Sequence, residues 1–271
     1  MPQTFATFTN TRRTEVALHN APALPVLADP SRIPDGSVDL VLTDPPYIIS
    51  RESGFDHTRA DGSGGGLKRF HSYQTDFGAW DREGGFTMDD LAATVAALPR
   101  VLRPGGTAIV FFDIWKISPL AEMMQAAGFV GIEMIEWVKT NPVPVNSKRT
   151  YLSNAREVAL VGHLPEGEGP GMTATRRGGP RDGIYRYPIY HAKDRFHPTQ
   201  KSLPLFKELL RNYSRQGDTV LDCFSGSATT GVAAIGAGRH YIGCEPDPDC
   251  FAKSRARLIT AIHAHDAREV A

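Results

Sequence analysis

The sequence predicts an α/β fold in which a doubly wound, mostly parallel sheet carries helices on both faces. Short apolar runs alternate along most of the chain with segments of helical periodicity, which is the pattern of such a sheet. Two of these runs end in loops of small or rigid residues, at the strand ends where doubly wound folds bind ligands. No apolar run in the 271 residues approaches the roughly 18 residues of a membrane helix. We therefore expect a cytoplasmic protein without membrane contact.

The first half of the chain supplies the first strands and helices. The apolar run Val38–Thr43 predicts a buried strand that stops at Pro45 and Pro46, because prolines cannot continue a sheet ladder. Leu91, Val95 and Leu98 recur at helical spacing, and the helix is expected to end at residues 103–106, Arg-Pro-Gly-Gly. The remaining segments are a strand at 107–112, a helix at 120–129 and a strand pair at 132–138 and 158–161.

The second half repeats the alternation. Leu205, Leu209 and Tyr213 share one helical face, and the run Thr219–Asp222 predicts the next strand. A helix of small residues is expected at 226–237, followed by a strand at His240–Cys244. Pro248 fits the first turn of a last helix, which is expected to run to about residue 263.

Two stretches fall outside this rhythm, although we expect residues 1–271 to form a single domain. Residues 50–83 are polar and Gly-rich, and residues 165–195 are rich in Gly, Arg and Tyr. Irregular segments of that length in a compact domain are usually functional. We expect both segments to be mobile in the absence of a ligand.

Charge and cysteine content narrow the class of protein further. Residues 171–215 hold ten Lys or Arg and three acidic residues, on a chain whose net charge is zero. A local basic stripe on a neutral protein suits an enzyme that binds a polyanion on one face. The three cysteines are widely spaced, and the histidines lack metal-ligand spacing, so we expect neither a disulfide framework nor a metal site.

The segment 222–231, Asp-Cys-Phe-Ser-Gly-Ser-Ala-Thr-Thr-Gly, lies where a strand turns into a helix. Small residues there let a ligand approach the backbone closely. Glu245, after the next strand, is placed to accept hydrogen bonds from ribose hydroxyls. The pair suits a dinucleotide or another adenosine-containing cofactor. The spacing matches neither GxGxxG nor GxxxxGK[ST], which disfavours a nicotinamide dehydrogenase and a P-loop protein.

The segment Asp44-Pro45-Pro46-Tyr47 suits chemistry on an exocyclic amine of a nucleic-acid base. Such an amine is a poor nucleophile because its lone pair is delocalised into the ring. The Asp44 carboxylate and the Pro45 carbonyl would accept its two hydrogens and expose the lone pair, while Tyr47 would stack on the base. Pro46 helps to fix the relative positions of these groups.

With these motifs the chain resembles the beta group of DNA amino-methyltransferases, in which the catalytic motif precedes the cofactor motif. Residues 40–47 match the catalytic motif, and residues 222–231 match the cofactor loop DxFxGSGTT. Residues 197–201, His-Pro-Thr-Gln-Lys, match the segment that closes on the methionine of the cofactor. Residues 137–142, Trp-Val-Lys-Thr-Asn-Pro, match a segment near the target-base pocket.

The resemblance implies a site-specific methyltransferase that uses S-adenosyl-L-methionine and acts on double-stranded DNA. The target base must be flipped out of the duplex, and direct attack by its amine needs no covalent enzyme intermediate. The implied catalytic residues are Asp44, Pro45, Pro46 and Tyr47. The implied cofactor-binding residues are Asp222, Phe224, Ser225, Gly226, Ser227, Thr229, Glu245, His197, Thr199, Gln200 and Lys201. The implied DNA-binding residues are Lys139, Asn141, Arg176, Arg177, Arg181 and Arg186. The resemblance also implies that residues 50–83 form the mobile target-base loop and that residues 165–195 form an inserted target-recognition region.

The resemblance favours N6 of adenine as the target because Asp44 stands where cytosine-N4 enzymes more often carry Ser. Cytosine N4 is the alternative. An RNA methyltransferase is less favoured because the catalytic motif precedes the cofactor motif in this chain. A non-catalytic DNA-binding protein is less favoured because Asp44, Tyr47, Asp222 and Glu245 are all present. Ala228 stands where the family usually has glycine, and Cys223 where proline is common. Little sequence follows Leu258, so a homodimer is one arrangement that would supply further DNA contacts. A cognate restriction endonuclease would be a further partner, but the sequence does not reveal whether one exists.

Overall fold

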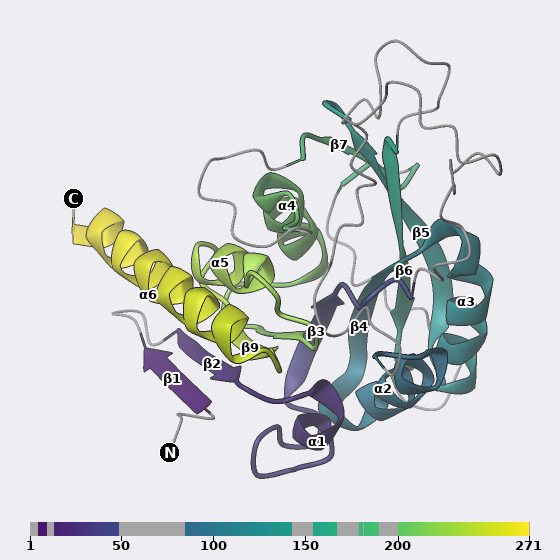
Figure 1. Cartoon of the computed structure of the whole chain (residues 1–271), viewed down its shortest axis with the longest axis horizontal. Helices are drawn as coiled ribbons and strands as arrows, with labels where there is room; N and C mark the ends of the chain where they lie inside the picture. Colours follow the sequence, from purple (N-terminus) through teal and green to yellow (C-terminus); the bar gives the residue numbers. More distant parts are fainter. Residues whose placement is uncertain are drawn as a thin grey trace, which may run out of the picture.

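The computed structural model describes residues 5–9, 14–48, 85–142, 154–166, 179–180, 182–189 and 200–270. Within these residues, nine strands form one sheet in the order β1-β2-β9-β8-β3-β4-β6-β5-β7 (Figure 1). The pairs β1–β2, β4–β6 and β5–β6 are antiparallel, and the other neighbours are parallel. The predicted mostly parallel α/β sheet is therefore confirmed, with an antiparallel strand inserted beside β4.

The strands and helices alternate along most of the chain. The strands are β1 (Phe5–Thr9), β2 (Glu15–His19), β3 (Val38–Thr43), β4 (Leu102–Phe112), β5 (Val130–Lys139), β6 (Arg156–His163), β7 (Ile184–Tyr187), β8 (Thr219–Asp222) and β9 (His240–Cys244). The helices are α1 (Ala23–Leu27), α2 (Met88–Val101), the 3-10 turn η3 (Ile114–Lys116), α3 (Ile117–Ala126), α4 (Leu203–Tyr213), α5 (Thr229–Ile235) and α6 (Pro248–Val270).

Helices cover both faces of the sheet, as Figure 1 shows. On one face, apolar side chains of α4, α5 and α6 pack against strands, with Phe206 stacked on Phe111 of β4 at a centroid distance of 5.6 Å. On the other face, α1, α2 and α3 enclose a second apolar layer that includes Leu27, Leu98 and Met124. Each strand in the middle of the sheet therefore contributes alternate side chains to two buried layers, which is the doubly wound arrangement.

Several elements differ from the sequence-based prediction. The helix expected at 226–237 begins only at Thr229, because Gly226 and Ala228 have φ angles of +49° and +57°, outside helical geometry. The last helix continues to Val270 because no Gly or Pro follows residue 248 to end it. The segment 103–106 belongs to β4 rather than to a separate helix end. Strand β1 at one edge and β7 at the other were not predicted.

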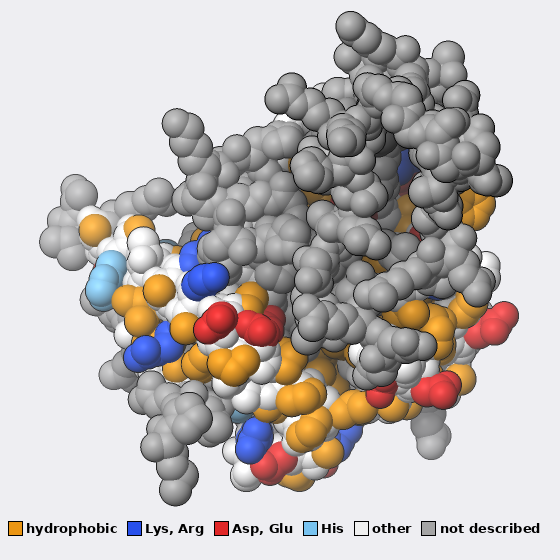
Figure 2. Space-filling model, in the orientation of Figure 1, with side chains coloured by type: hydrophobic (Ala, Val, Ile, Leu, Met, Phe, Trp, Pro, Cys, Tyr) orange, Lys and Arg blue, Asp and Glu red, His pale blue; other side chains and the backbone are white. Residues whose placement is uncertain are grey.

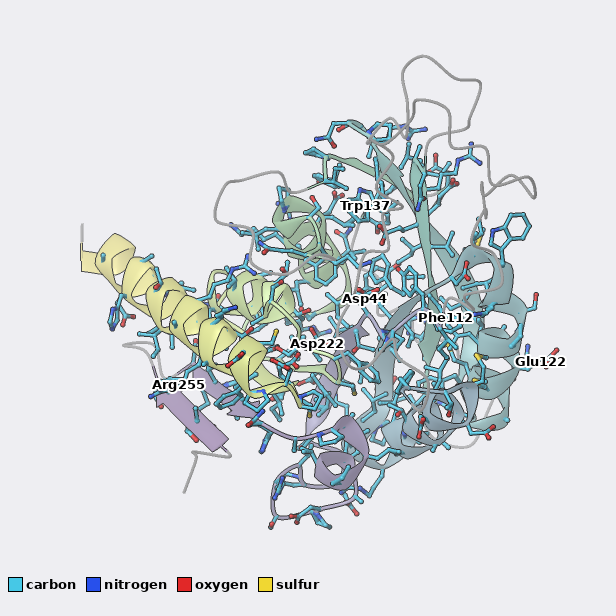
Figure 3. The ribbon with its side chains drawn as sticks, in the orientation of Figure 1. Asp44, Phe112, Glu122, Trp137, Asp222 and Arg255 are labelled. Atoms are coloured by element: carbon cyan, nitrogen blue, oxygen red, sulfur yellow. The ribbon has the colours of Figure 1, made fainter. Side chains whose placement is uncertain are left out.

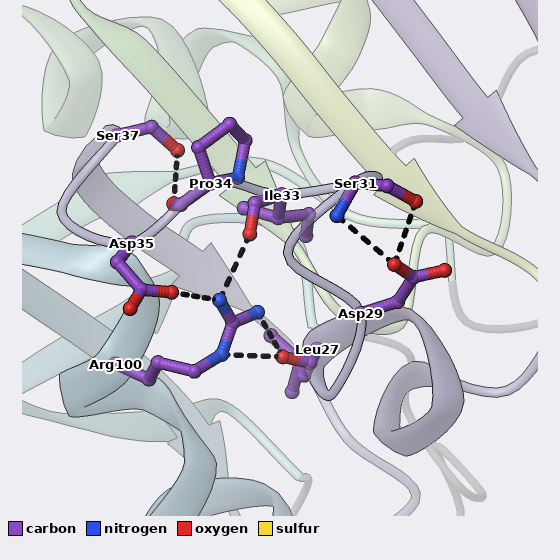
Figure 4. Close-up of polar contacts among 8 residues, drawn as sticks. All are labelled: Leu27, Asp29, Ser31, Ile33, Pro34, Asp35, Ser37 and Arg100. Atoms are coloured by element: carbon purple, nitrogen blue, oxygen red, sulfur yellow. Dashed lines mark hydrogen bonds and ion pairs between the residues drawn. The ribbon is translucent and has the colours of Figure 1, made fainter.

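Arg100, in the last turn of α2, fixes the connection between α1 and β3 (Figure 4). Its guanidinium donates from Nε to the Leu27 carbonyl at 2.9 Å and from Nη1 to the Ile33 carbonyl at 3.0 Å. It also forms an ion pair with Asp35. The bond to Leu27 satisfies a carbonyl at the end of α1, which lacks a partner within that helix, and the bond to Ile33 fixes the loop that follows. The start of β3, which leads to the Asp44 loop, is thereby held against α2.

The described surface is mixed in charge. On the face shown in Figure 2, Lys and Arg are interspersed with Asp and Glu among the described residues. Much of the predicted basic stripe, including Arg176, Arg177 and Arg181, lies outside the described residues, as do residues 50–83. Of the region 165–195, the structure describes residues 165–166, 179–180 and 182–189. Among the described helices, none combines the length and apolar character needed to cross a membrane.

Candidate active site

The predicted cofactor loop and the predicted catalytic loop meet at one edge of the sheet. Strands β3, β8 and β9 are neighbours and parallel, so their carboxyl ends lie together. Asp44 follows β3, Asp222 ends β8 and Glu245 follows β9. Figure 3 shows Asp44 and Asp222 close to each other in the middle of the molecule. Sequence segments almost 180 residues apart are thus joined, as the hydrogen bond between Thr43 and Asp222 records with a separation of 179 residues.

Asp222 is bonded within the protein through both carboxylate oxygens. Its Oδ1 accepts from Thr43 Oγ1 at 2.8 Å and from the Phe224 amide at 3.1 Å. Its Oδ2 accepts from Thr230 Oγ1 at 2.6 Å. Burial raises the pKa of Asp222 to about 6, although these three hydrogen bonds oppose the rise. The carboxylate therefore ties β3, the cofactor loop and α5 together.

Glu245 holds the glycine of the same loop. Its Oε2 accepts from the Gly226 amide at 2.9 Å, and its Oε1 accepts from the Asp247 amide at 2.9 Å. Burial raises the pKa of Glu245 to about 7, despite these two bonds. Each carboxylate oxygen has a second lone pair, so the side chain retains capacity for two further donors such as the hydroxyls of a ribose.

The loop between these two acids is closely packed. Ser225 Oγ lies 2.8 Å from Tyr241 Oη, and Ser227 Oγ lies 3.1 Å from Thr229 Oγ1. A Cβ atom added at Gly231, in α5, would lie 2.6 Å from Leu258 Cδ2 and 2.7 Å from Tyr241 Cε1. Glycine at this position therefore lets α5 approach β9 and α6 closely, and α5 in turn carries Thr230 to Asp222.

The predicted catalytic segment, residues 44–47, contacts side chains of η3 and β4. The Lys116 ammonium, at the end of η3, donates to the Tyr47 carbonyl at 3.3 Å and to the Ile48 carbonyl. Ile48 has a φ angle of +52°, a conformation that β-branched residues rarely adopt. The Tyr47 ring meets Phe112 edge to face at a centroid distance of 6.0 Å. The backbone after Tyr47 is strained, and Lys116 helps to stabilise it.

Four charged side chains and the Tyr47 hydroxyl form one buried network beside this segment. Lys201 Nζ lies 3.0 Å from Asp44 Oδ1 and 3.0 Å from Tyr47 Oη, and it also forms an ion pair with Glu157. Lys139 Nζ lies 2.9 Å from the other oxygen of Glu157, Oε1. Tyr47 Oη donates to Glu157 Oε2 at 3.2 Å. The side chains of the four charged residues are at most 18% exposed.

The pKa values of the two carboxylates in this network, Asp44 and Glu157, shift in opposite directions. Burial alone would raise the pKa of Glu157, but Lys201 and Lys139 outweigh it and lower that pKa to about 2. Burial raises the pKa of Asp44, and the single cation Lys201 only partly opposes the rise. Burial would lower the pKa of Lys201, but Asp44 and Glu157 together raise it. Glu157 is therefore firmly ionised, whereas Asp44 is the carboxylate whose ionisation is sensitive to its surroundings.

Most of this chain, including the strands and loops of the site, matches one protein family. The family model described as DNA methylase matches residues 38–166 and 171–254, which include Asp44, Glu157, Lys201, Asp222 and Glu245. The chain belongs to the DNA methylase family. The resemblance to DNA amino-methyltransferases that the motifs predicted is thereby confirmed.

A curated relative is similar over most of its length, and solved structures share the fold. This DNA methylase is 26% identical, over 239 residues, to the Type II methyltransferase M2.DpnII of Streptococcus pneumoniae, a match that covers 84% of this chain and 85% of that protein. The fold matches the structure of the M1.HpyAVI–SAM complex with a TM-score of 0.63 at 23% identity, over 90% of this chain and 98% of the other. It matches the cytosine-N4-specific PvuII DNA methyltransferase with a TM-score of 0.64 at 17% identity, over 96% and 94% of the two chains.

The predicted site residues of this DNA methylase occupy several environments. Asp44, Pro45, Pro46 and Tyr47 form the loop after β3, and Phe224, Ser225, Gly226, Ser227 and Thr229 lie in or next to the loop after β8. The buried atoms Gln200 Oε1 and Ser202 Oγ, on either side of Lys201, have no hydrogen-bond partner among the described residues. His197 and Thr199 lie outside the described residues.

The residues predicted to bind DNA are only partly placed. Lys139 is buried against Glu157, with its ammonium 5.6 Å from the centroid of the Trp137 ring. Asn141 Oδ1 accepts from the Ile189 amide at 2.7 Å, so this side chain joins the segments that follow β5 and β7. Arg186 is exposed on the edge strand β7. Arg176, Arg177 and Arg181 lie outside the described residues.

Sequence reasoning missed Glu157 and Lys116. Glu157 precedes an apolar run that reads as an ordinary buried strand, and Lys116 follows an exposed tryptophan. The sequence contained one signal for Glu157. A carboxylate at the start of a buried strand, near the ends of other strands, requires a nearby cation to balance its charge. The identity of that cation, Lys201, was not visible from the sequence because it lies 44 residues away.

Proposed function

We propose that this DNA methylase transfers a methyl group from S-adenosyl-L-methionine to the N6 amino group of adenine at a short specific site in double-stranded DNA. The observation that carries the proposal is the hydrogen bond of 2.8 Å between Thr43 and Asp222. It brings the end of the strand before Asp44-Pro45-Pro46-Tyr47 against the loop that would hold the cofactor. A target amine and a methyl donor would then meet above adjacent strand ends.

The residues around the second loop fit an adenosine-containing amino-acid cofactor. Glu245 keeps free acceptor capacity for ribose hydroxyls next to the close turn at Gly226. The buried oxygen of Gln200, which has no hydrogen-bond partner in the described part of the chain, suits the ammonium of an amino acid, and the Ser202 hydroxyl suits its polar end. The bound cofactor would supply an electrophilic methyl group. The solved M1.HpyAVI–SAM complex shares this fold, which supports the choice of cofactor.

The chain's own residues would activate and orient the target amine. Asp44 and the Pro45 carbonyl would accept its two hydrogens, which favours a tetrahedral nitrogen with an exposed lone pair. Tyr47 would stack on the flipped base, its ring held by Phe112 and its hydroxyl by Glu157 and Lys201. Asp44 is assigned to orientation before attack, because the amine proton becomes acidic only once the new N–C bond forms.

Mass spectrometry of nucleosides tests the reaction directly. Duplex DNA, and RNA in a parallel reaction, is incubated with the protein and S-adenosylmethionine carrying a labelled methyl group, with the Asp44→Ala variant as the control. Labelled N6-methyladenine from the wild-type protein alone is the expected result. N4-methylcytosine would keep the mechanism and overturn the choice of base. Labelled RNA nucleosides alone, or no labelled nucleoside with either nucleic acid, would overturn the proposal in favour of an RNA methyltransferase or a non-catalytic protein.

The segments and partners around the site belong to the same proposal. Residues 50–83 would close over the flipped base, and residues 165–195, with Arg186, would read the DNA sequence. The relative from Streptococcus pneumoniae is named a Type II methyltransferase, which supports a companion restriction endonuclease. A homodimer would add DNA contacts from a second copy. Light scattering coupled to size exclusion would show twice the monomer mass of 29.6 kDa if the homodimer forms.

A further inference from the structure

We propose that Glu157 is a positioning residue for the transfer reaction. With Lys139 as its counter-ion, Glu157 holds Lys201 beside Asp44 and shares the positive charge of Lys201. Asp44 therefore stays available to the target amine. The inference rests on the proposed function, because it gives Asp44 the role of amine acceptor. It adds a residue outside the motifs that carry the family resemblance.

The geometry of the sheet places Glu157 for this role. Glu157, near the start of β6, is the register partner of Trp137 in β5, two residues before Lys139 on the same face. From there its Oε1 reaches Lys139, and its Oε2 reaches Lys201 and the Tyr47 hydroxyl. One carboxylate therefore contacts the predicted base-stacking residue and both lysines of the site.

The charges around Asp44 explain what Glu157 contributes. The groups that face Asp44 are Lys201, Glu157 and the neutral Tyr47 hydroxyl, with Asp222 of β8 nearby and Lys139 behind Glu157. If Lys201 formed an ion pair with Asp44 alone, it would neutralise the carboxylate and compete with the target amine for its oxygens. Here Lys201 is divided between two carboxylates, and the side-chain hydrogen bonds that Asp44 receives come from Lys201 and Tyr47, which leaves part of its acceptor capacity unused. An incoming amine finds a buried acceptor with unused capacity.

A neighbouring ion pair between β5 and β6 provides a comparison for the buried Glu157 network. Glu136 pairs with Arg156 Nε at 3.0 Å, on the opposite face of the strand from Trp137. The Arg156 side chain is 68% exposed, so this pair is solvated and worth little. Glu157 differs by its burial, its two cations and its contact with Tyr47. Glu136 therefore offers a matched control for the same chemical change.

The test compares the pH dependence of kcat in three variants. In Glu157→Gln the negative charge beside Asp44 is lost and Lys201 turns wholly to Asp44, so the pKa of Asp44 falls and the acidic limb of kcat moves down by about one pH unit. The plateau of kcat falls by about 10–100-fold, because Lys201 now competes with the amine, while KM for the cofactor is unchanged. In Lys139→Met a cation is lost and Glu157 draws Lys201 away, so the acidic limb moves up. Glu136→Gln leaves both quantities at their wild-type values.

A measurement without turnover separates this inference from the proposed function. Carbon NMR titration of the Asp44 carboxyl, with neither DNA nor cofactor, should give pKa values in the order Glu157→Gln, wild type, Lys139→Met, from lowest to highest. That order of pKa values is expected even if no methylated nucleoside is found. The absence of a methylated nucleoside would contradict the proposed function but not the role of Glu157. Equal Asp44 pKa values in all three proteins, or a kcat loss in Glu157→Gln with an unmoved acidic limb and a lowered Tm, would show that Glu157 is merely structural.

Discussion

Thr43 Oγ1 donates a hydrogen bond of 2.8 Å to Asp222 Oδ1 between the carboxyl ends of adjacent strands. Thr43 is the last residue of β3, and Asp222 is the last residue of β8. The residue after Thr43 begins the predicted catalytic loop, and the residue after Asp222 begins the predicted cofactor loop. The two loops are therefore coupled by a buried hydrogen bond between the strand ends that precede them.

Replacement of Thr43 tests that coupling. Thr43→Val keeps the shape of the side chain but removes a donor from a buried carboxylate, which should lower the free energy of unfolding by about 1–3 kcal/mol. The affinity for S-adenosylmethionine should fall as well, because Asp222 no longer holds the loop in place. Denaturant unfolding and calorimetric titration measure the two effects. Thr43→Ser retains the hydroxyl and should keep both properties near wild type; equal losses in the two variants would contradict the coupling.

Replacement of Asp44 should separate catalysis from cofactor binding. Asp44→Ala removes the carboxylate that would accept from the amine, and methyl transfer should fall by about 100-fold or more. Lys201 keeps its partner Glu157 in that variant, so the fold of the site is preserved. Calorimetric titration should therefore give the wild-type affinity for S-adenosylmethionine. A variant that no longer binds the cofactor would place Asp44 in the cofactor site instead.

The pH dependence of cofactor binding should follow Glu245. Burial raises the pKa of Glu245 to about 7 in the free protein. Ribose hydroxyls would donate to its ionised form, so binding favours the carboxylate and releases a proton wherever the free side chain is protonated. The Kd for S-adenosylmethionine should thus increase as the pH falls, being about tenfold higher at pH 6 than at pH 8. Glu245→Gln should bind more weakly with a flat profile, and a flat wild-type profile would remove Glu245 from the ribose site.

The packing of α5 predicts a sharp difference between two glycines. Gly231→Ala would force a methyl group to within 2.6 Å of Leu258 and 2.7 Å of Tyr241. Such overpacking should lower the free energy of unfolding by about 1–3 kcal/mol. Gly236, at the end of the same helix, has a right-handed conformation, and an added Cβ would approach no atom closer than 3.4 Å. Gly236→Ala should leave stability nearly unchanged in the same unfolding experiment, and similar losses would refute the packing argument.

The strands that carry the site were predictable because each is a short apolar run that ends at polar or rigid residues. Strands β3, β8 and β9 were predicted with the bounds that the structure shows, and the parallel arrangement brought their loops together as expected. The start of α5 was placed too early, because a run of small residues does not reveal the left-handed turn that precedes Thr229. Strand β7 was missed because it has only four residues inside a Gly- and Arg-rich region.

The charged network was not predictable in the same way. It depends on β6 running antiparallel between β4 and β5, which turns the start of β6 toward the edge where the parallel strands end. Only then does Glu157 meet Lys139 and Lys201. Sequence reasoning assigned these two lysines separately to DNA and to the cofactor, because spacing along the chain says nothing about a shared carboxylate.

Ala228 adopts a φ angle of +57° at a position where the family usually has glycine. An L residue tolerates that conformation at a cost of about 1–2 kcal/mol, so the turn needs its backbone shape more than it needs a particular residue. A sequence pattern that requires glycine at this position would not match this chain. A pattern that specifies the turn geometry and the two flanking acids, Asp222 and Glu245, would match it.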